Sequence, residues 1–329
     1  MQWDYAIDFG TDAVRVLTAG ESDIRVEAAC AAFRGDAGQP FAWGDRAYAF
    51  VGREAPDMKI RLCMRSGLCL DLPLLNEWVG RLLSAGSRKR RNVLMTLSPQ
   101  TADSTAEAIL STLTDVNVDV LGLVPSDLAV GLGAEDGGED GRFVLDIGAS
   151  QISFSAQYGG RRVAYLCQPE GMDRVDEAVI QLARRRLGLC ISPRTARLLK
   201  HSAFSRGEEA LSCAVFDPTT RLPREEKIPL EIAQDAMEET VSRILSVLRR
   251  GIDRLSGDLT GLLMEKGLIL CGGGSRIGGM DKLLSGEVGV PVRLSGQPRE
   301  AAVLGLRRIM EKPELAFMIE KTKDAGVRL

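Results

Sequence analysis

The chain has 329 residues, 45% of them hydrophobic, and a formal net charge of −3. Its length is sufficient for two substantial cores, and its slightly acidic balance gives no support for nucleic acid as a partner. The seven cysteines are scattered and form no CxxC pair, which disfavours a disulfide framework and, with a single histidine at His201, a zinc site. The chain has no apolar run long enough for a membrane-spanning helix.

Strands and helices alternate along the first half, as the spacing of its apolar residues indicates. The expected elements are strands over 4–10, 13–19 and 24–33, a helix over 72–85, a strand over 93–97, a helix over 102–113 and a strand over 118–124. Such an alternation predicts right-handed βαβ crossovers and a largely parallel sheet.

A polar, glycine-rich segment over 135–141 is the clearest linker, and we expect it to join two similar halves. After it, helices and strands alternate again, with a less regular stretch over 204–231. The expected elements are helices over 172–187, 193–201 and 232–255, a strand over 267–271, a helix from Gly279, a strand over 290–294, and helices over 300–311 and 314–324.

The same short phrase occurs twice, as Ile-Asp-Phe-Gly-Thr-Asp from Ile7 and as Leu-Asp-Ile-Gly-Ala-Ser from Leu145. Each copy lies between two apolar runs, which predicts two β-hairpins that each have an aspartate leading into a glycine turn. Backbone N–H groups of such a turn can hold phosphate oxygens, and the aspartates can hold a water of a bound Mg²⁺. Two facing hairpins could clamp a nucleoside triphosphate; the alternative is that each aspartate serves only its turn.

Further motifs follow in a fixed order along the chain. They lie at 44–47 with 51–53, 173–180 with 184–185, 195–200, 270–275 and 288–292. Together with the first hairpin, these segments resemble the actin superfamily and, within it, the bacterial MreB family, over almost the whole chain. The resemblance implies an α/β, actin-like fold of two similar domains whose mixed sheets flank a nucleotide cleft. We expect one half over 1–140, with 299–329 packing back on it, and the other over 141–298.

The resemblance also implies that ATP and Mg²⁺ bind between the two halves. The residues it implies for nucleotide binding are Asp8, Gly10, Thr11, Asp146, Gly148, Lys200, Gly272, Gly273 and Gly274. Asp8 and Asp146 are the implied Mg²⁺ ligands. By the same resemblance, the halves close on nucleotide, and subunits stack head to tail with identical or paralogous MreB subunits into filaments that act in cell-shape determination.

The cleft departs from the family pattern at four places. Val124 occupies the position of the family's water-positioning glutamate, and a valine cannot orient an attacking water; Asp127 is near in sequence but would point elsewhere on a helix. The second turn has Gly-Ala-Ser-Gln over 148–151, Asp12 places a carboxylate near the expected phosphates, and Arg197 replaces a glutamate that contacts the ribose. These changes predict weak or absent hydrolysis, so that the chain is an ATPase at most.

A basic run contributes four cations, at Arg88, Lys89, Arg90 and Arg91. Basic residues near an anionic leaflet contribute roughly 1 kcal/mol each, so this loop could hold a filament on the inner membrane; the alternative is a solvated surface loop. Because the start of the chain has no signal-peptide pattern, the expected location is the cytoplasm, at the inner face of the cell membrane.

The sequence leaves two other functions open. One is a non-polymerising actin-fold adaptor at the inner membrane, comparable to the pilus protein PilM, whose second loop can also be Asp-Ile-Gly-Ala-Ser; the segment 173–200 is closer to MreB. The other is a sugar or acetate kinase, for which we find no catalytic carboxylate or Arg/His constellation in the sequence. The segment 315–319 extends past the usual end of the family and is expected to pack on the first half or to contact a partner or membrane.

Overall fold

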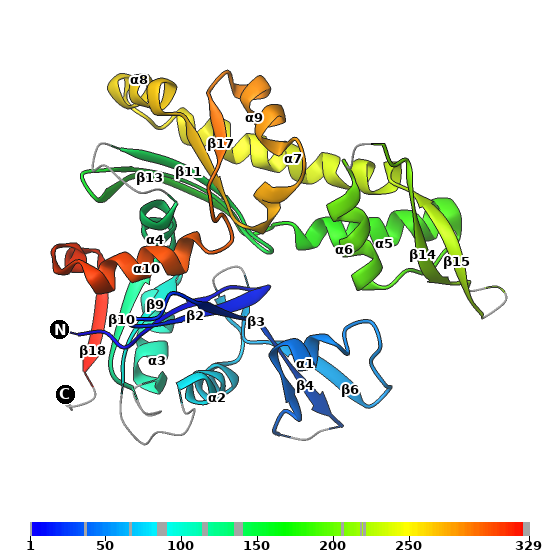
Figure 1. The fold of residues 1–329 in the computed structure, drawn as a ribbon, viewed down its shortest axis with the longest axis horizontal. Helices are drawn as coiled ribbons and strands as arrows, with labels where there is room; N and C mark the ends of the chain where they lie inside the picture. Colours follow the sequence, from blue (N-terminus) through cyan, green and yellow to red (C-terminus); the bar gives the residue numbers. More distant parts are fainter. Residues whose placement is uncertain are drawn as a thin grey trace.

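The computed structural model describes residues 2–35, 38–65, 68–83, 91–113, 118–134, 141–204, 207–217, 219 and 222–324. Two sheets with helices on their outer faces form two halves, and a pair of helices lies between the sheets (Figure 1). The expected linker over 135–141 lies outside the described residues, except for Gly141. No helix within the described ranges is long and apolar enough to cross a membrane.

The first sheet has six strands in the order β18-β10-β9-β1-β2-β3. Strands β1, β9 and β10 are parallel, whereas β2, β3 and β18 pair antiparallel with their neighbours. Its elements are β1 (Tyr5–Phe9), β2 (Ala13–Thr18), β3 (Ile24–Ala28), β9 (Arg91–Leu97), β10 (Val118–Pro125), β18 (Lys321–Asp324), α2 (Leu72–Leu83) and α3 (Asp103–Leu113). Helices α2 and α3 cover the outer face, where Trp78 and Ile109 are buried in one core with Ile7.

The second sheet has five strands in the order β13-β12-β11-β16-β17. Its strands are β11 (Arg142–Ile147), β12 (Ile152–Tyr158), β13 (Arg161–Gln168), β16 (Leu268–Cys271) and β17 (Val292–Leu294). Its helices are α5 (Asp173–Leu187), α7 (Glu231–Ile252), α8 (Gly257–Lys266) and α9 (Met280–Val288). Phe154 of the sheet, Val179 of α5 and Leu248 of α7 belong to one buried core, so these helices cover the outer face.

Two helices form the layer between the sheets (Figure 1). They are α4 (Ser126–Gly133) and α10 (Ala301–Glu311). Ala129 of α4 is buried in a core with the first sheet, and the adjacent Val130 is buried in a core with the second. A Cβ on Gly133 would collide with the backbone of α10, and one on Gly305 with the backbone of α4. The close crossing of these helices therefore requires glycines that a helix interior otherwise disfavours.

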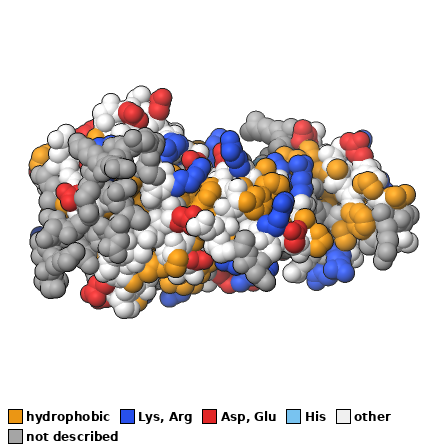
Figure 2. Space-filling view, turned by 90° about the horizontal axis from the view of Figure 1, so that it is seen from below, with side chains coloured by type: hydrophobic (Ala, Val, Ile, Leu, Met, Phe, Trp, Pro, Cys, Tyr) orange, Lys and Arg blue, Asp and Glu red, His pale blue; other side chains and the backbone are white. Residues whose placement is uncertain are grey.

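Each half carries a smaller outer piece (Figure 1). In the first half it consists of β4 (Cys30–Arg34), β5 (Ala42–Trp43), α1 (Gly44–Tyr48), β6 (Met58–Leu62), β7 (Met64–Arg65) and β8 (Leu68–Cys69). In the second half it consists of α6 (Pro193–Ser202), β14 (Ala210–Phe216) and β15 (Pro223–Pro229). Figure 2 shows hydrophobic side chains at the end of the molecule formed by β14 and β15, where Phe216 and Leu222 are exposed.

The strand expected over 24–33 is wrong in its extent, because the chain changes sheet at Ala29. Ala28 ends β3 in the first sheet, and Cys30 begins β4, which pairs antiparallel with β6. The apolar run continues through the change, so the pattern of side chains alone does not reveal it.

The helix expected over 314–324 is also wrong. The segment forms a 3-10 helix, η2 (Pro313–Met318), followed by β18, which pairs antiparallel with β10. The Glu320 N–H donates to the Leu123 carbonyl at 3.0 Å, where the extended pairing begins. The open edge of β10 supplies hydrogen-bond partners that only the folded sheet presents.

Candidate functional site

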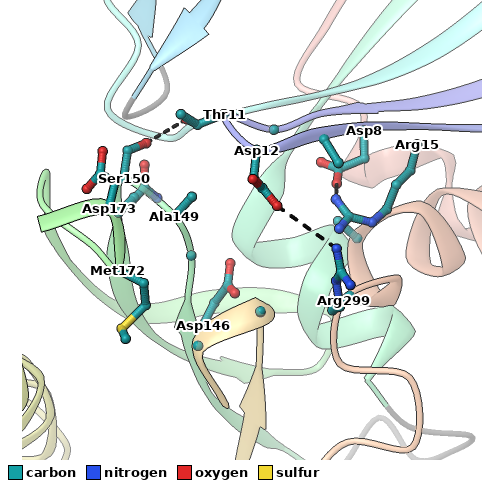
Figure 3. A pocket seen from close by; sticks show the side chains of 18 of the residues that line it. Asp8, Thr11, Asp12, Arg15, Asp146, Ala149, Ser150, Met172, Asp173 and Arg299 are labelled. Carbon is teal, nitrogen blue, oxygen red and sulfur yellow. Dashed lines mark hydrogen bonds and ion pairs between the residues drawn. The ribbon is translucent and has the colours of Figure 1, made fainter. Parts of the chain in front are cut away.

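The two hairpins predicted from the repeated phrase are confirmed, and their turns have the same geometry. In β1–β2 the Gly10 N–H donates to the Ala13 carbonyl at 3.2 Å. In β11–β12 the Gly148 N–H donates to the Gln151 carbonyl at 2.8 Å. Each turn is thus closed by the glycine that the sequence marks, and each presents its tip to the space between the two halves (Figure 3).

A cavity of about 680 Å³ lies between the hairpin tips. This volume is within the usual range for small-molecule sites. The structure places every residue predicted to bind nucleotide on its wall: Asp8, Gly10, Thr11, Asp146, Gly148, Lys200, Gly272, Gly273 and Gly274. Residues from both sheets and from α6 therefore meet at one place, and their role in binding a nucleotide stays a prediction.

The glycine-rich wall of the cavity is the turn from β16 into η1 (Gly273–Arg276). Gly272 has φ +79°, and a Cβ on it would collide with the backbone of Ile147. A Cβ on Gly274 would collide with the side chains of Ile147 and Met172. Gly273 has open space around it. Two of the three glycines thus serve close packing against β11, and Gly273 is where a ligand can approach the backbone.

Lys200 ties two helices together at the edge of the cavity. Its Nζ lies 2.7 Å from Oδ1 of Asp176 on α5 and donates to the Met172 carbonyl at 3.1 Å. Burial lowers the pKa of Lys200, and the carboxylate of Asp176 opposes this shift. The ammonium is therefore held by the protein itself, and a ligand would share it with Asp176.

The aspartates of the two hairpins have different surroundings. Oδ1 of Asp8 accepts from the Thr96 hydroxyl at 2.8 Å, and Oδ2 faces the Arg15 guanidinium at 3.5 Å (Figure 3). Burial raises the pKa of Asp146 to about 7; the charge of Asp8 adds to this shift, and the charge of Arg15 opposes it. A cation is thus already present beside Asp8 and within electrostatic reach of Asp146, and its charge opposes the binding of Mg²⁺ by these two carboxylates.

Arg15 is the functional candidate that the sequence did not single out. It is 8% exposed and lines the cavity, between Val14 and Val16, which are both buried. A lone charged residue in an apolar strand was the available signal, since an arginine is seldom buried without a carboxylate partner.

Side chains from the two halves contact each other across the cavity. The hydroxyls of Thr11 and Ser150 lie 2.5 Å apart at the two tips. The guanidinium of Arg197, on α6, lies 2.8 Å from the carboxylate of Asp12, and that of Arg299 lies 4.0 Å from it (Figure 3 shows the second pair). Asp12 and Arg197, which the sequence showed as two separate departures, are therefore partners.

The model of the family described as MreB/Mbl protein matches residues 2–317. The chain belongs to the MreB/Mbl family. It is 23% identical over 312 residues to the cell shape-determining protein Mbl of Bacillus subtilis, covering 92% of this chain and 94% of that protein. It is 26% identical over 326 residues to the cell shape-determining protein MreB of Escherichia coli K12, covering 94% of this chain and 93% of that protein.

Solved structures show the same fold. MreB5 of Spiroplasma citri bound to AMPPNP superposes with a TM-score of 0.88 at 19% identity, covering 95% of this chain and 97% of that one. A subunit of the MamK double helical filament superposes with a TM-score of 0.80 at 16% identity, covering 94% and 98%. This MreB/Mbl family member therefore has the actin-like fold, as predicted, with α/β halves and mixed sheets.

Val124 and Asp127, two residues considered in the sequence, are both buried. Val124 is fully buried in a core with α4 and α10. Asp127, the nearest carboxylate in sequence, is also buried: the Arg162 guanidinium donates to both of its oxygens at 2.7 Å, and the Ser155 hydroxyl donates at 3.2 Å. Asp127 is thus committed to the second sheet, which agrees with the expectation that it points away from the cleft.

The basic run proposed for membrane contact lies largely outside the described residues. Arg88, Lys89 and Arg90 are not described, and Arg91 begins β9. The contact of this run with a membrane stays a prediction from the sequence.

Proposed function

We propose that this MreB/Mbl family member binds ATP in the cavity between its two halves and forms or joins actin-like filaments in cell-shape determination. The observation that carries the proposal is the meeting of two matching glycine turns, one from each sheet, at one cavity beside Gly273. Its relatives are cell shape-determining proteins, and the fold is shared with a MamK filament subunit. The partners would be identical or paralogous MreB subunits.

The contacts across the cavity give nucleotide a way to influence the two halves. Phosphates that lie between the turns would compete with the Thr11–Ser150 hydrogen bond and with the Asp12–Arg197 ion pair, which now join the halves. A ligand that replaces these contacts changes the angle between the sheets, which is how hinge closure shifts a surface for assembly.

Hydrolysis in this cleft would be weak or absent. Val124 has no group that can orient a water, and Asp127 is held by Arg162 in the core of the second half. A water-positioning residue typically contributes much of the rate in phosphoryl transfer. ATP would then act mainly as a bound ligand that holds one arrangement of the halves.

Contact with the inner membrane surface forms part of the proposal and rests on the basic run alone. Co-sedimentation with vesicles that contain anionic lipid, compared with neutral vesicles, tests it. Loss of binding on replacing Arg88, Lys89 and Arg90 by serine is the expected result, and equal binding to neutral vesicles would contradict it.

Sedimentation of the purified chain with Mg-ATP, with Mg-ADP and without nucleotide tests the main proposal, with electron microscopy of the pellets. The cleft variant is Gly273→Asp, which adds bulk and negative charge where the cavity is open. Its matched control is Gly257→Asp, the same change at the start of α8, where nothing lies within 4 Å of the added Cβ.

Nucleotide-dependent filaments that form from the native chain and from the Gly257 variant, but not from the Gly273 variant, are the expected result. A monomer under all three conditions, alone and when mixed with a competent MreB paralogue, would contradict filament formation and favour the non-polymerising adaptor. Filaments that form equally with and without nucleotide, in both variants, would contradict the role of the cleft.

A further inference from the structure

Arg15 has a fixed position relative to the cleft because the hairpin sets it. Asp8 on β1 and Arg15 on β2 are directly opposite each other in the antiparallel register, so their side chains leave the same face of the sheet. The two side chains are 15% and 10% exposed and both line the cavity, so this ion pair belongs to the cavity wall and not to the outer surface. The backbone register of β1 and β2 therefore places the Arg15 guanidinium close to the turn that Gly10 closes.

The guanidinium contacts the carboxylate of the first hairpin and acts electrostatically on that of the second. It faces Oδ2 of Asp8 at 3.5 Å, and its charge also acts on Asp146 across the cleft. A Mg²⁺ held through water by Asp8 and Asp146 would need the negative potential of both carboxylates. Arg15 reduces that potential at the same place and repels a dication.

Arg15 has donors to spare for a ligand. A guanidinium has five N–H groups, and in the described part of the chain only the long contact with Asp8 uses one of them. Its enclosed Nε has no hydrogen-bond partner among the described residues. A planar guanidinium matches a phosphate group and is always charged, so its terminal N–H groups can donate to a phosphate beside Asp8.

The wall of the cavity is balanced in charge without any bound ion. Its acidic residues are Asp8, Asp12, Asp146, Asp173 and Asp176, and its basic residues are Arg15, Arg197, Lys200, Arg276 and Arg299. Among the described residues of the wall the five basic side chains equal the five acidic ones in number, so the carboxylates have counter-charges that belong to the chain itself.

We propose that Arg15 takes the place of the divalent cation in this cleft, so that nucleoside di- and triphosphates bind through its guanidinium and without Mg²⁺. This inference rests on the proposed nucleotide site and concerns how its phosphates are neutralised. It makes Arg15 a specificity-determining residue that selects metal-free nucleotide.

The test compares nucleotide binding with Mg²⁺ and with EDTA by isothermal titration, using ADP and AMPPNP. The native chain is expected to bind with affinities that differ by less than about twofold between the two conditions. Arg15→Leu, which keeps the apolar strand, is expected to lose at least about tenfold in EDTA and to recover part of the loss with Mg²⁺. Arg15→Lys should retain most of the metal-free binding, because the charge remains.

Arg25→Leu is the matched control, since Arg25 lies on the neighbouring strand β3 and donates to the Leu82 carbonyl, away from the cavity. It should bind like the native chain in both conditions. Loss of binding by the native chain in EDTA, or unchanged metal-free binding by Arg15→Leu, would overturn the proposal.

A second measurement separates this inference from the proposed function. Mn²⁺ binding to the nucleotide-free chain is followed by electron paramagnetic resonance. Gain of a Mn²⁺ site in Arg15→Leu, with none in the native chain, is expected, and a tight Mn²⁺ site in the native chain would overturn the role of Arg15. If the native chain binds no nucleotide in either condition, the proposed function fails, and Mn²⁺ binding still decides whether Arg15 replaces the cation.

Discussion

The two hairpins share a turn but differ in the residue opposite the aspartate. Asp8 lies opposite Arg15, and Asp146 lies opposite Ser153 at the equivalent place in the second hairpin. The Arg15 guanidinium gives Asp8 a counter-charge. The Ser153 hydroxyl provides no charge for Asp146, and burial raises the pKa of Asp146 to about 7. The same phrase in the sequence thus produces one aspartate in an ion pair and one whose pKa is raised by burial, because burial and the strand opposite differ between the two turns.

The largest expected effect comes from replacing the residue opposite the aspartate in the first hairpin. Arg15→Leu should lower the free energy of unfolding by about 2 kcal/mol or more, because it leaves the Asp8 carboxylate in a largely buried site without its counter-charge. The matched change Ser153→Ala should cost less than about 1 kcal/mol. Urea unfolding of the two variants and the native chain at neutral pH measures both values. Equal losses in the two variants would contradict the difference between the hairpins.

Asp146→Asn tests the second hairpin through the pH dependence of the free energy of unfolding. The folded chain holds the Asp146 proton up to about pH 7, whereas the unfolded chain releases it near 3.8. Asp146 therefore makes a destabilising contribution that grows as pH rises from about 4 to about 7 and is constant above that range. The asparagine does not titrate, so the stability of the Asp146→Asn variant relative to the native chain should rise by about 2–3 kcal/mol between pH 5 and pH 8.

Thermal or urea unfolding of Asp146→Asn and the native chain across this pH range checks the prediction. Asp8→Asn is the control in the other hairpin: it removes the counter-charge of Arg15 and should destabilise the chain at neutral pH. A gain from both substitutions, or from neither, would mean that the partner opposite the aspartate does not decide its charge.

The smallest expected effect concerns the ion pair that joins the halves. Asp12 and Arg197 are each 35% exposed, so solvent weakens their attraction. A double-mutant cycle with Asp12→Asn and Arg197→Leu should give a coupling energy of about 0.2–1 kcal/mol in nucleotide-free protein. Saturation with nucleotide should reduce this coupling if phosphates displace the pair. A coupling that nucleotide leaves unchanged would show that the ligand does not separate Asp12 from Arg197.

Local pattern was sufficient for most elements and for the walls of the candidate site. The period of apolar residues predicted α2, α3, α5 and α7 to within a few residues, and the repeated phrase predicted both hairpins. The predictions of these helices and hairpins are confirmed because the buried face of a helix and a glycine turn are specified by residues close together in sequence. The order of motifs then brought Lys200 and Gly273 into the predicted site before any distance was known.

The actin-like architecture and the two glycine turns followed from the sequence alone, because both are specified by motifs of neighbouring residues. The tertiary structure decided the break at Ala29, the strand β18 and the partners inside the cleft. Asp12 and Arg197 are far apart in the chain and meet only when the halves come together. The strength of such an ion pair depends on the distance between the charges and on their burial, and the spacing of residues along the chain specifies neither.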